Sequence, residues 1–362
     1  TAKIIFKRET LEKEIAEANA GPDAVHCLYT PDRFAHTSLS PYLTAFIGQN
    51  PQSHTRIRLN RLLLETAYPH ELAQSPGGVY PDQEIYTPSV EDQQHAFQEY
   101  SQDAFRRMQL GQLRPGEDVK LVDGKIMVGG TVAVMSINAL LAKTIFDRNP
   151  NHEFFIEESF PLDWMYPYLT PHGVIMKLKR QPLASIPEDT LRRDHEFWKQ
   201  YSRRLTGDII DSDTPVRDIC AWLEKTSLRS DFSGFTGDRK FIHDIDAQKS
   251  FSKLRTAIAG IYAWRLSQGC PAELRPKSQP EFLALVREAN FAFLQAFAFC
   301  PWSPEAVLRY ANFLLQCNRI DDALLIAETC LKFDPYDGQV SSLADNLRQI
   351  KRQMQTSVPP RS

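Results

Sequence analysis

Residues 303–335, SPEAVLRYANFLLQCNRIDDALLIAETCLKFDP, decide the fold of the second half of this chain. Apolar side chains recur at helical spacing in both halves of the stretch, which predicts a pair of helices with Tyr310, Ala311 and Leu314 on the first. The small side chains of Ala311 and Ala323 allow the two helices to approach closely. A helix pair of this length and pattern is typical of a tetratricopeptide repeat.

The same pattern occurs one repeat earlier, because Pro301 and Pro335 are separated by one tetratricopeptide period of 34 residues. Counting back from each proline pairs three positions at which the second helix of a repeat meets its neighbours: Ala289 with Ala323, Phe293 with Ala327, and Ala296 with Cys330. The first helix of the earlier repeat is expected at 251–266, and residues 268–280 form an insertion before its second helix. With a polar capping helix at 337–355, these features predict tetratricopeptide-like repeats over residues 251–355.

Residues 1–180 mix helical and strand patterns. The clearest helix is expected at 89–110, where Ser89 can cap the first turn and Asp92 completes a capping box. Asp123-Gly124, between two apolar runs at 119–128, predicts a β-hairpin with a type I′ turn. The helix that opens at Thr131 is apolar on most faces, so we expect it to be sandwiched in the core.

Further strands are expected at 153–157 and 174–179, and a helix and a short strand nearer the start, at 8–20 and 25–29. Strands separated by helices predict a layered α/β domain over residues 1–180. No strand is expected after residue 187. The fold class is therefore an α/β half followed by an all-α half that ends in tetratricopeptide-like repeats.

Residues 181–250 are expected to connect the two halves as a helical segment. Helices at 187–204 and 214–229 both have proline at the first helical positions. A polar loop is expected at 230–248.

Composition limits the possible functions. In 362 residues, 42% are hydrophobic and 24% charged, which is ordinary globular usage, and a net charge of -3 argues against a nucleic-acid binder. Apolar runs are all shorter than the roughly 18–20 residues that a membrane-spanning helix needs, so this chain is expected to be soluble. It begins at Thr1 with neither methionine nor a signal peptide, and we expect Thr1 to be a truncation point. The 6 cysteines show no CxxC pair, and buried free thiols are the favoured interpretation.

Common catalytic motifs such as GxxxxGK[ST], GxGxxG, GxSxG and HExxH do not occur in the sequence. Two D-x-D triplets, Asp211 with Asp213 and Asp244 with Asp246, could hold a metal and a nucleotide-sugar diphosphate. The interpretation that these acids mark helix starts is favoured, because a carboxylate there complements the helix dipole. No catalytic residue, metal site or cofactor is therefore predicted.

The densest group of polar and aromatic residues follows the strand expected at 153–157. It contains six candidate binding residues: Glu157, Glu158, Asp163, Tyr166, Tyr168 and His172. Paired carboxylates near a histidine could perform acid–base chemistry or orient a sugar. The favoured alternative is that Phe160, Trp164 and Tyr168 fill the core, since aromatic side chains bury large areas. Asp32 and Arg33, after the first strand, form a weaker second candidate, and His195 is interpreted as a packing residue.

Four segments resemble the C-terminal part of a large bacterial membrane-protein family that was long labelled a domain of unknown function. They are INALLAKTIFDRNP at 137–150, HEFFIEESFPLDWMYPYLTPHGVIMKLKR at 152–180, LRSDFSGFTGD at 228–238 and RIDDALLIAETCLKFDP at 319–335. Members of this family begin with a multi-span membrane region of the glycosyltransferase-C type, and an animal relative is a protein O-mannosyltransferase. The resemblance covers about residues 85–340 and is thin before residue 80.

The resemblance implies a membrane enzyme that uses a lipid-linked sugar, whose catalytic acids lie in a membrane region outside this chain. The leading hypothesis is therefore a soluble accessory region on the periplasmic face of the inner membrane, which binds a protein acceptor or partner and the membrane portion of the same protein. A free-standing tetratricopeptide scaffold, soluble in the cytoplasm, is the second hypothesis. The third is a soluble enzyme whose site lies in residues 157–172.

Overall fold

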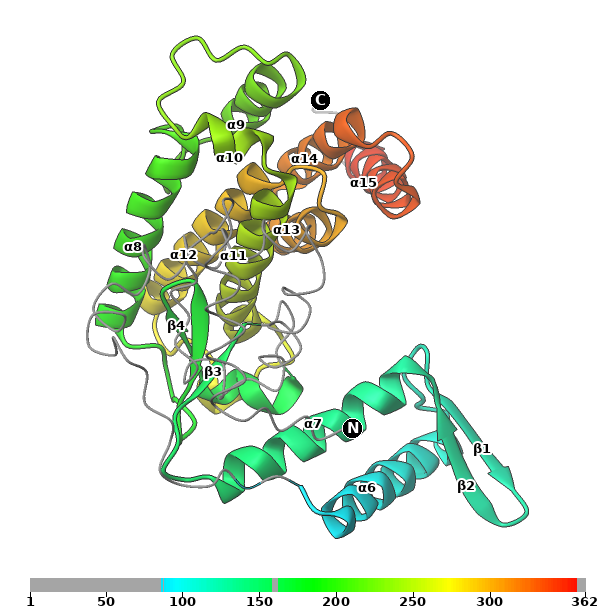
Figure 1. Ribbon diagram of the computed structural model, residues 1–362. Helices are drawn as coiled ribbons and strands as arrows, with labels where there is room; N and C mark the ends of the chain where they lie inside the picture. The colour runs from blue at the N-terminus through cyan, green and yellow to red at the C-terminus, as the bar shows by residue number, and fades with distance from the viewer. Residues whose placement is uncertain (1–85, 87, 158–161, 357–362) are drawn as a thin grey trace, which may run out of the picture.

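The structure is a computed structural model that describes residues 86, 88–157 and 162–356 (Figure 1). The helix expected at 8–20, the strand expected at 25–29 and the candidates Asp32, Arg33 and Glu158 lie outside the described residues. The described part is mostly helical, with small antiparallel sheets before the long helical region.

The chain first forms α6 (Val90–Gln109), a hairpin of β1 (Asp118–Val122) and β2 (Lys125–Gly129), and α7 (Gly130–Arg148). The expected capping box is present, since Ser89 accepts a hydrogen bond from the Asp92 backbone and the Asp92 side chain accepts one from the Ser89 backbone. Asp123 and Gly124 have φ values of 49° and 75°, as the predicted hairpin turn requires. A small core of four buried side chains joins these elements: Tyr100, Ala104, Val119 and Ala133. We call this part the hairpin lobe.

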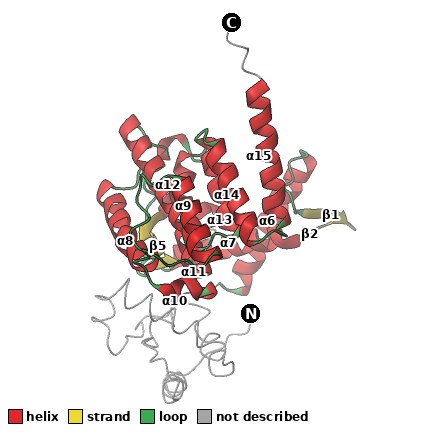
Figure 2. Ribbon diagram, turned by 90° about the horizontal axis from the view of Figure 1, so that it is seen from above, coloured by secondary structure: helices red, strands yellow, loops and turns green. Residues whose placement is uncertain are grey.

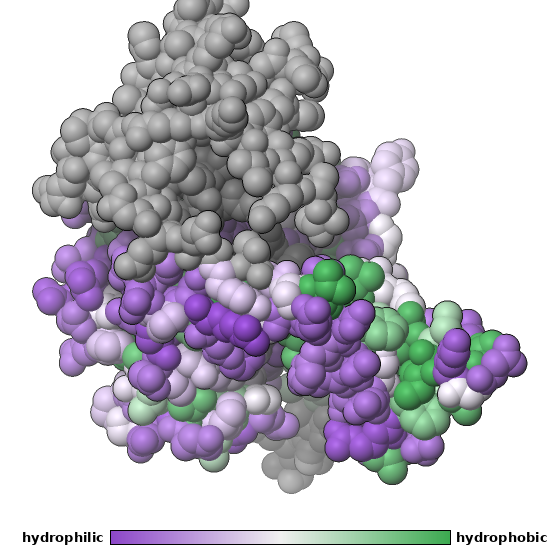
Figure 3. Space-filling model, turned by 60° about the horizontal axis from the view of Figure 1, so that its bottom comes forward, coloured by the Kyte–Doolittle hydropathy of each residue, from purple (hydrophilic) through white to green (hydrophobic). Residues whose placement is uncertain are grey.

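The expectation that α7 lies sandwiched in the core is wrong. Only Ala133 and Phe146 of this helix are buried, and Val134 and Met135 are 59% and 46% exposed. The reason is that, within the described part of the chain, α6 and the hairpin cover one side of α7 and leave much of its apolar surface exposed. Figure 3 shows apolar surface on the side of the molecule where the hairpin lobe lies.

Two helices in the described residues are long and apolar enough to cross a membrane, by length and composition alone. One is α12 (Gln279–Phe299), with 61% of its apolar window buried, as in the core helix of a globular protein. The other is α7, with only 11% buried.

A three-stranded antiparallel sheet follows, in the order β3-β5-β4. Its strands are β3 (Phe154–Ile156), β4 (Leu169–His172) and β5 (Ile175–Leu178), with a 3-10 helix, η2 (Asp163–Tyr168), between β3 and β4. The sequence pattern missed β4, because prolines at 167 and 171 made this stretch resemble a connection. The three strands follow one another within one short segment and pair antiparallel, so this sheet is not of the helix-alternating layered type expected from the sequence.

The remaining described elements are helical, as expected: α8 (Glu188–Thr206), α9 (Val216–Leu223), the π-helical turn η3 (Glu224–Leu228), α10 (Arg239–His243), α11 (Ile245–Leu266), the 3-10 turn η4 (Ala272–Leu274), α12, α13 (Pro304–Gln316), α14 (Ile320–Phe333) and α15 (Gly338–Thr356). The polar loop predicted at 230–248 extends too far, because α10 and the start of α11 fall within it. Asp244 accepts a hydrogen bond from the Ala247 backbone and starts α11 six residues before the expected 251.

Consecutive helices from α11 to α15 pack against one another, and α13 also contacts α11 and α15. Figure 2 shows helices α8 to α14 side by side, with α15 extending beyond them. The positions selected by the 34-residue period are buried, namely Ala289, Phe293, Ala296, Pro301, Ala311, Ala323, Ala327 and Cys330, whereas Pro335 is exposed. One continuous hydrophobic core extends from Phe146 and the sheet to Leu347 in α15.

The described cysteines are free thiols, as expected. Cys220, Cys270, Cys300 and Cys330 are buried, and Cys317 is half-buried. Burial raises the pKa of Cys220 to about 11, so this thiol is protonated at neutral pH and unreactive.

Candidate functional site

The structure divides the predicted polar and aromatic group between two cavities. Asp163 and Tyr166, on η2, line one cavity, and His172, at the end of β4, lines the other. Glu157 is exposed just after β3. Tyr168 lines neither cavity and belongs to the hydrophobic core.

The packing interpretation fits Tyr168 and Trp164. The ring of Tyr168 lies 5.8 Å from that of Phe146 and 6.1 Å from that of Trp164, both in edge-on geometry. The Trp164 indole N–H donates a 3.0 Å hydrogen bond to the Ala139 carbonyl, which ties η2 to α7. These two aromatic residues are thus fixed by the core, where their area contributes to stability.

Tyr166 makes a different contact, since its ring stacks on Trp264 of α11 with centroids 5.2 Å apart. Burial raises the pKa of Tyr166, and the positive charge of Arg309 on α13 partly opposes that rise. The Arg309 guanidinium also lies 3.3 Å from the point that a Cβ on Gly260 would occupy, so it crosses α11 where that helix has no side chain. Tyr166, Trp264 and Arg309 form what we call the aromatic junction between η2 and the helices α11 and α13.

The cavity beside the aromatic junction has a volume of about 520 Å³ and lies between α6, α7 and η2. One wall is the apolar surface of α7, with Val132, Met135 and Leu140. The opposite wall carries Asp103 and Arg107 of α6, which are ion-paired at 2.8 Å. This cavity therefore combines an apolar wall with a polar rim.

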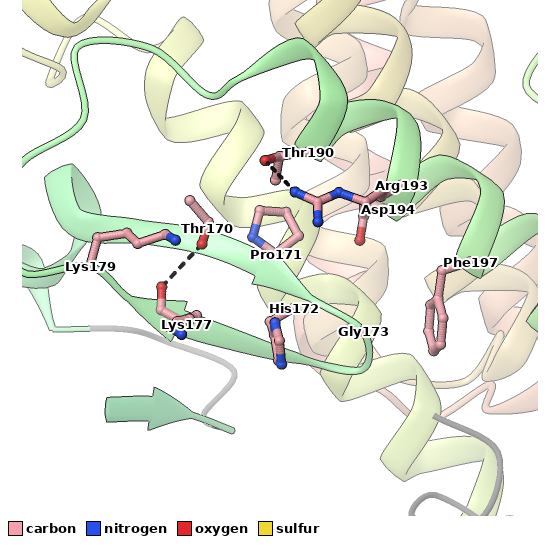
Figure 4. Close-up of a pocket in the computed structure, with 10 residues that line it drawn as sticks. All are labelled: Thr170, Pro171, His172, Gly173, Lys177, Lys179, Thr190, Arg193, Asp194 and Phe197. Carbon is pink, nitrogen blue, oxygen red and sulfur yellow. Dashed lines mark hydrogen bonds between the residues drawn. The ribbon is translucent and has the colours of Figure 1, made fainter. Parts of the chain in front are cut away.

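The second cavity has a volume of about 390 Å³ and lies between the β4–β5 hairpin and α8 (Figure 4). We call it the hairpin cavity; it is separate from the hairpin lobe, whose hairpin is β1–β2. Its lining comprises Thr170, Pro171, His172, Gly173, Lys177, Lys179, Thr190, Arg193, Asp194 and Phe197. Lys177 lies in β5 and Lys179 directly follows it, where its backbone N–H donates to the Tyr168 carbonyl at 2.8 Å, and both side chains line the cavity.

Cationic side chains dominate the rim of the hairpin cavity. Lys177 is ion-paired with Glu153, and Arg193 is ion-paired with Asp189 one helical turn away at 2.9 Å. Lys179 is exposed and makes no ion pair with any described residue. The rim therefore carries excess positive charge.

Below the rim lies a buried polar network that sequence reasoning did not identify. The Asp194 carboxylate is 1% exposed, and its Oδ2 accepts hydrogen bonds from Arg255 at 2.9 Å and Tyr262 at 2.7 Å. Gln295 accepts from Arg255 Nε at 2.7 Å and donates to Ser202 at 3.0 Å, so the network joins α8, α11 and α12. A signal was present, since Asp194, Trp198 and Tyr201 share one helical face, which predicts that Asp194 points into the core.

Within this network, burial raises the pKa of Asp194, and the neighbouring Arg255 guanidinium opposes that rise. Asp194 Oδ1 and Arg255 Nη2 are buried and have no hydrogen-bond partner among the described residues.

His195, interpreted as a packing residue, lies with its ring centroid 4.6 Å from that of Phe291, and its Nδ1 is 3.0 Å from Glu288.

The D-x-D triplets take structural roles where their contacts are visible. Asp244 caps α11, as expected. Asp211 is ion-paired with Lys199 at 3.0 Å, and Asp213 lies 3.4 Å from Arg287. Within the described residues, no three His, Cys, Asp or Glu side chains are grouped so that they could hold a metal ion.

No protein-family model, curated protein or solved structure matches this chain. The functional argument therefore rests on the geometry of the helical region, the aromatic junction and the two cavities.

Proposed function

We propose that this chain is the extracytoplasmic accessory region of a membrane glycosyltransferase that glycosylates proteins, and that helices α11–α15 bind the protein acceptor or a partner protein. In this proposal, α11–α12 and α13–α14 are two tetratricopeptide-like repeats and α15 is their capping helix. The membrane portion of the same protein performs the chemistry on the periplasmic face of the inner membrane.

The observation that carries the proposal is a face of α13 that the other described helices leave exposed. One side of α13 buries Val307, Tyr310 and Leu314. The other side exposes Asn312 and Gln316 to solvent. This face adjoins α15, because α13 packs against both α11 and α15 and α11 is largely buried. Stacked helix pairs provide extended surfaces of this kind for binding polypeptides.

The hairpin lobe gives a second, independent support. Residues 126–142 contain no charged side chain, yet most of α7 is not buried. A helix that is apolar on most faces is usually covered by protein or lipid. An adjoining apolar portion of the same protein would cover this surface.

The alternative of a free-standing scaffold shares the binding surface but needs no membrane portion. The alternative of an enzyme with a site at 157–172 gains no support from the geometry, because Asp163 and Tyr166 line a different cavity from His172.

Site-specific photo-crosslinking tests the binding surface. A photoreactive amino acid is placed at Asn312, on the uncovered face of α13, and in a matched control at Gln200, an exposed position on α8. Crosslinking at Asn312 but not Gln200, to an extracytoplasmic protein that carries O-linked sugar, is the expected result. Equal crosslinking at both positions, or adducts limited to cytoplasmic proteins, would contradict the proposal.

The coding sequence upstream of Thr1 distinguishes the accessory region from the free-standing scaffold. The proposal expects several apolar segments of about 20 residues each in the same reading frame. A stop codon directly upstream, or a hydrophilic reading frame, would leave only the scaffold.

A further inference from the structure

The hairpin cavity combines three features that a binding site for a small acidic ligand requires. Lys177 on β5, Lys179 directly after that strand and Arg193 on α8 line one cavity. Figure 4 shows Arg193 and Asp194 next to each other on α8, facing the β4–β5 hairpin. Lys179 makes no ion pair among the described residues, and the Glu153 carboxylate on which its charge acts is already paired with Lys177, so the Lys179 ammonium can still bind an anion.

The same cavity also offers groups that recognise hydroxyls. Thr170 and Thr190 contribute hydroxyl groups to the lining. Asp194 lines the cavity, and its Oδ1 is a buried acceptor with no hydrogen bond from a described residue. A buried carboxylate oxygen without a donor is unfavourable, so a ligand donor that reaches it would gain more than an exposed hydrogen bond does.

The cavity also has an apolar wall, formed by Pro171 and Phe197. Phe197 is held in place by stacking on Tyr201, with ring centroids 5.5 Å apart. An aromatic ring fixed in this way can lie against the C–H face of a polyol. The cavity volume of about 390 Å³ is within the range of small-molecule sites.

We propose that the hairpin cavity binds a small hydroxylated anion, a sugar or polyol that carries a phosphate or carboxylate group. Lys179 and Arg193 bind the acidic group, Asp194 and the two threonines accept or donate hydrogen bonds to hydroxyls, and Phe197 packs against the carbon skeleton. This proposal can fail without affecting the proposed binding role of α11–α15, because none of the side chains assigned to the ligand comes from those helices.

Isothermal titration calorimetry of the full chain tests the proposal with four probes: glucose 6-phosphate, glucuronate, glucose and inorganic phosphate. Glucose 6-phosphate or glucuronate should bind at least about tenfold more tightly than glucose or inorganic phosphate, since only they carry both the acid and the hydroxyls. The comparison of glucose 6-phosphate with glucuronate decides between phosphate and carboxylate. Inorganic phosphate binding as tightly as both would overturn the hydroxyl part, and binding of none of the four would overturn the site.

A pair of lysine variants locates the binding. Lys179→Ala should weaken binding of the tighter of the two acidic sugars about tenfold or more, because one charge-assisted hydrogen bond is lost. Lys199→Ala removes the same charge from an exposed position of α8 outside the cavity and should leave binding unchanged. Both side chains are exposed, so neither change should affect folding, which circular dichroism would verify. Equal losses in the two variants would show a general charge effect and contradict the assignment.

Discussion

Tyr166 and Trp264 stack with ring centroids 5.2 Å apart and an interplanar angle of 20°. The pair joins η2, in the segment that the sequence marked as a candidate site, to the first helix of the proposed array. Tyr166, predicted as a candidate binding residue, is thus better explained as an anchor between η2 and α11.

Replacing Tyr166 tests this anchoring role. Tyr166→Ala should lower the free energy of unfolding by about 1–3 kcal/mol, because both the stack and the buried area are lost. Tyr166→Phe keeps the ring and should cost much less. Urea denaturation of the two variants measures the difference, and equal losses would show that the hydroxyl rather than the ring matters.

The ion pair of Asp194 and Arg255 should dominate the stability of the helical region. Both side chains are at most 1% exposed. Arg255→Met leaves the Asp194 carboxylate buried without its guanidinium and should cost about 3–5 kcal/mol. The double variant Asp194→Leu with Arg255→Met should be more stable than Arg255→Met alone. A double-mutant cycle by chemical denaturation measures the coupling, and additive losses would contradict it.

The hairpin lobe should lose stability in acid because of Glu117. Burial raises the pKa of this carboxyl, but hydrogen bonds from Arg107, the Arg114 backbone and Tyr100 outweigh burial, so the pKa lies below its ordinary 4.5. Because the pKa of Glu117 is lower in the folded state, ionised Glu117 stabilises the lobe at every pH above its unfolded-state pKa. This stabilisation is lost as the pH falls through the folded-state pKa. The protection factors of α6 amides, which correct hydrogen exchange for its slower intrinsic rate in acid, should therefore fall between pH 7 and pH 3.

Glu117→Gln is the matched control for that experiment. It removes the titrating group and the ion pair with Arg107, which is 2.6 Å long. The lobe should then be less stable at pH 7 and less sensitive to acid than the unmodified chain. An unchanged pH dependence would assign the effect to other carboxyls.

Packing between α13 and α14 is tested at Ala323, which is completely buried. Ala323→Leu should overpack the helix pair and cost about 1–3 kcal/mol, lowering the melting temperature. Asp321→Leu, at an exposed position of the same helix, should have a much smaller effect. A melting temperature unchanged by Ala323→Leu would argue against the close approach expected of a tetratricopeptide-like pair.

Local signals predicted the helices well. Ser89, Asp123-Gly124 and the apolar stripes of α13 and α14 act over a few residues, so their effect on the backbone can be read from neighbouring positions. Strand β4 was missed because Pro171 sits in it, although its partner β5 was recognised. Pairing with β5 overrides the local preference of the prolines.

Tertiary relationships were harder to predict. The apolar composition of α7 indicated a need for cover, but not that the described part of the chain provides little of it. The ion pair of Asp194 and Arg255 joins residues 61 positions apart, so no periodic pattern reveals it. The division of residues 157–172 between two cavities likewise depends on where α6, α7 and α8 pass.

Arg193 and Asp194 are adjacent on α8, yet one lines the rim of the hairpin cavity and the other holds α8 to α11 and α12. Occupancy of the cavity and integrity of the helical region are therefore thermodynamically linked. A ligand present at a hundred times its dissociation constant adds about 2.7 kcal/mol to the stability of any structure that must be folded to bind it. Through this one helix, a ligand of the proposed cavity site would also stabilise the packing of the helices proposed to bind a polypeptide.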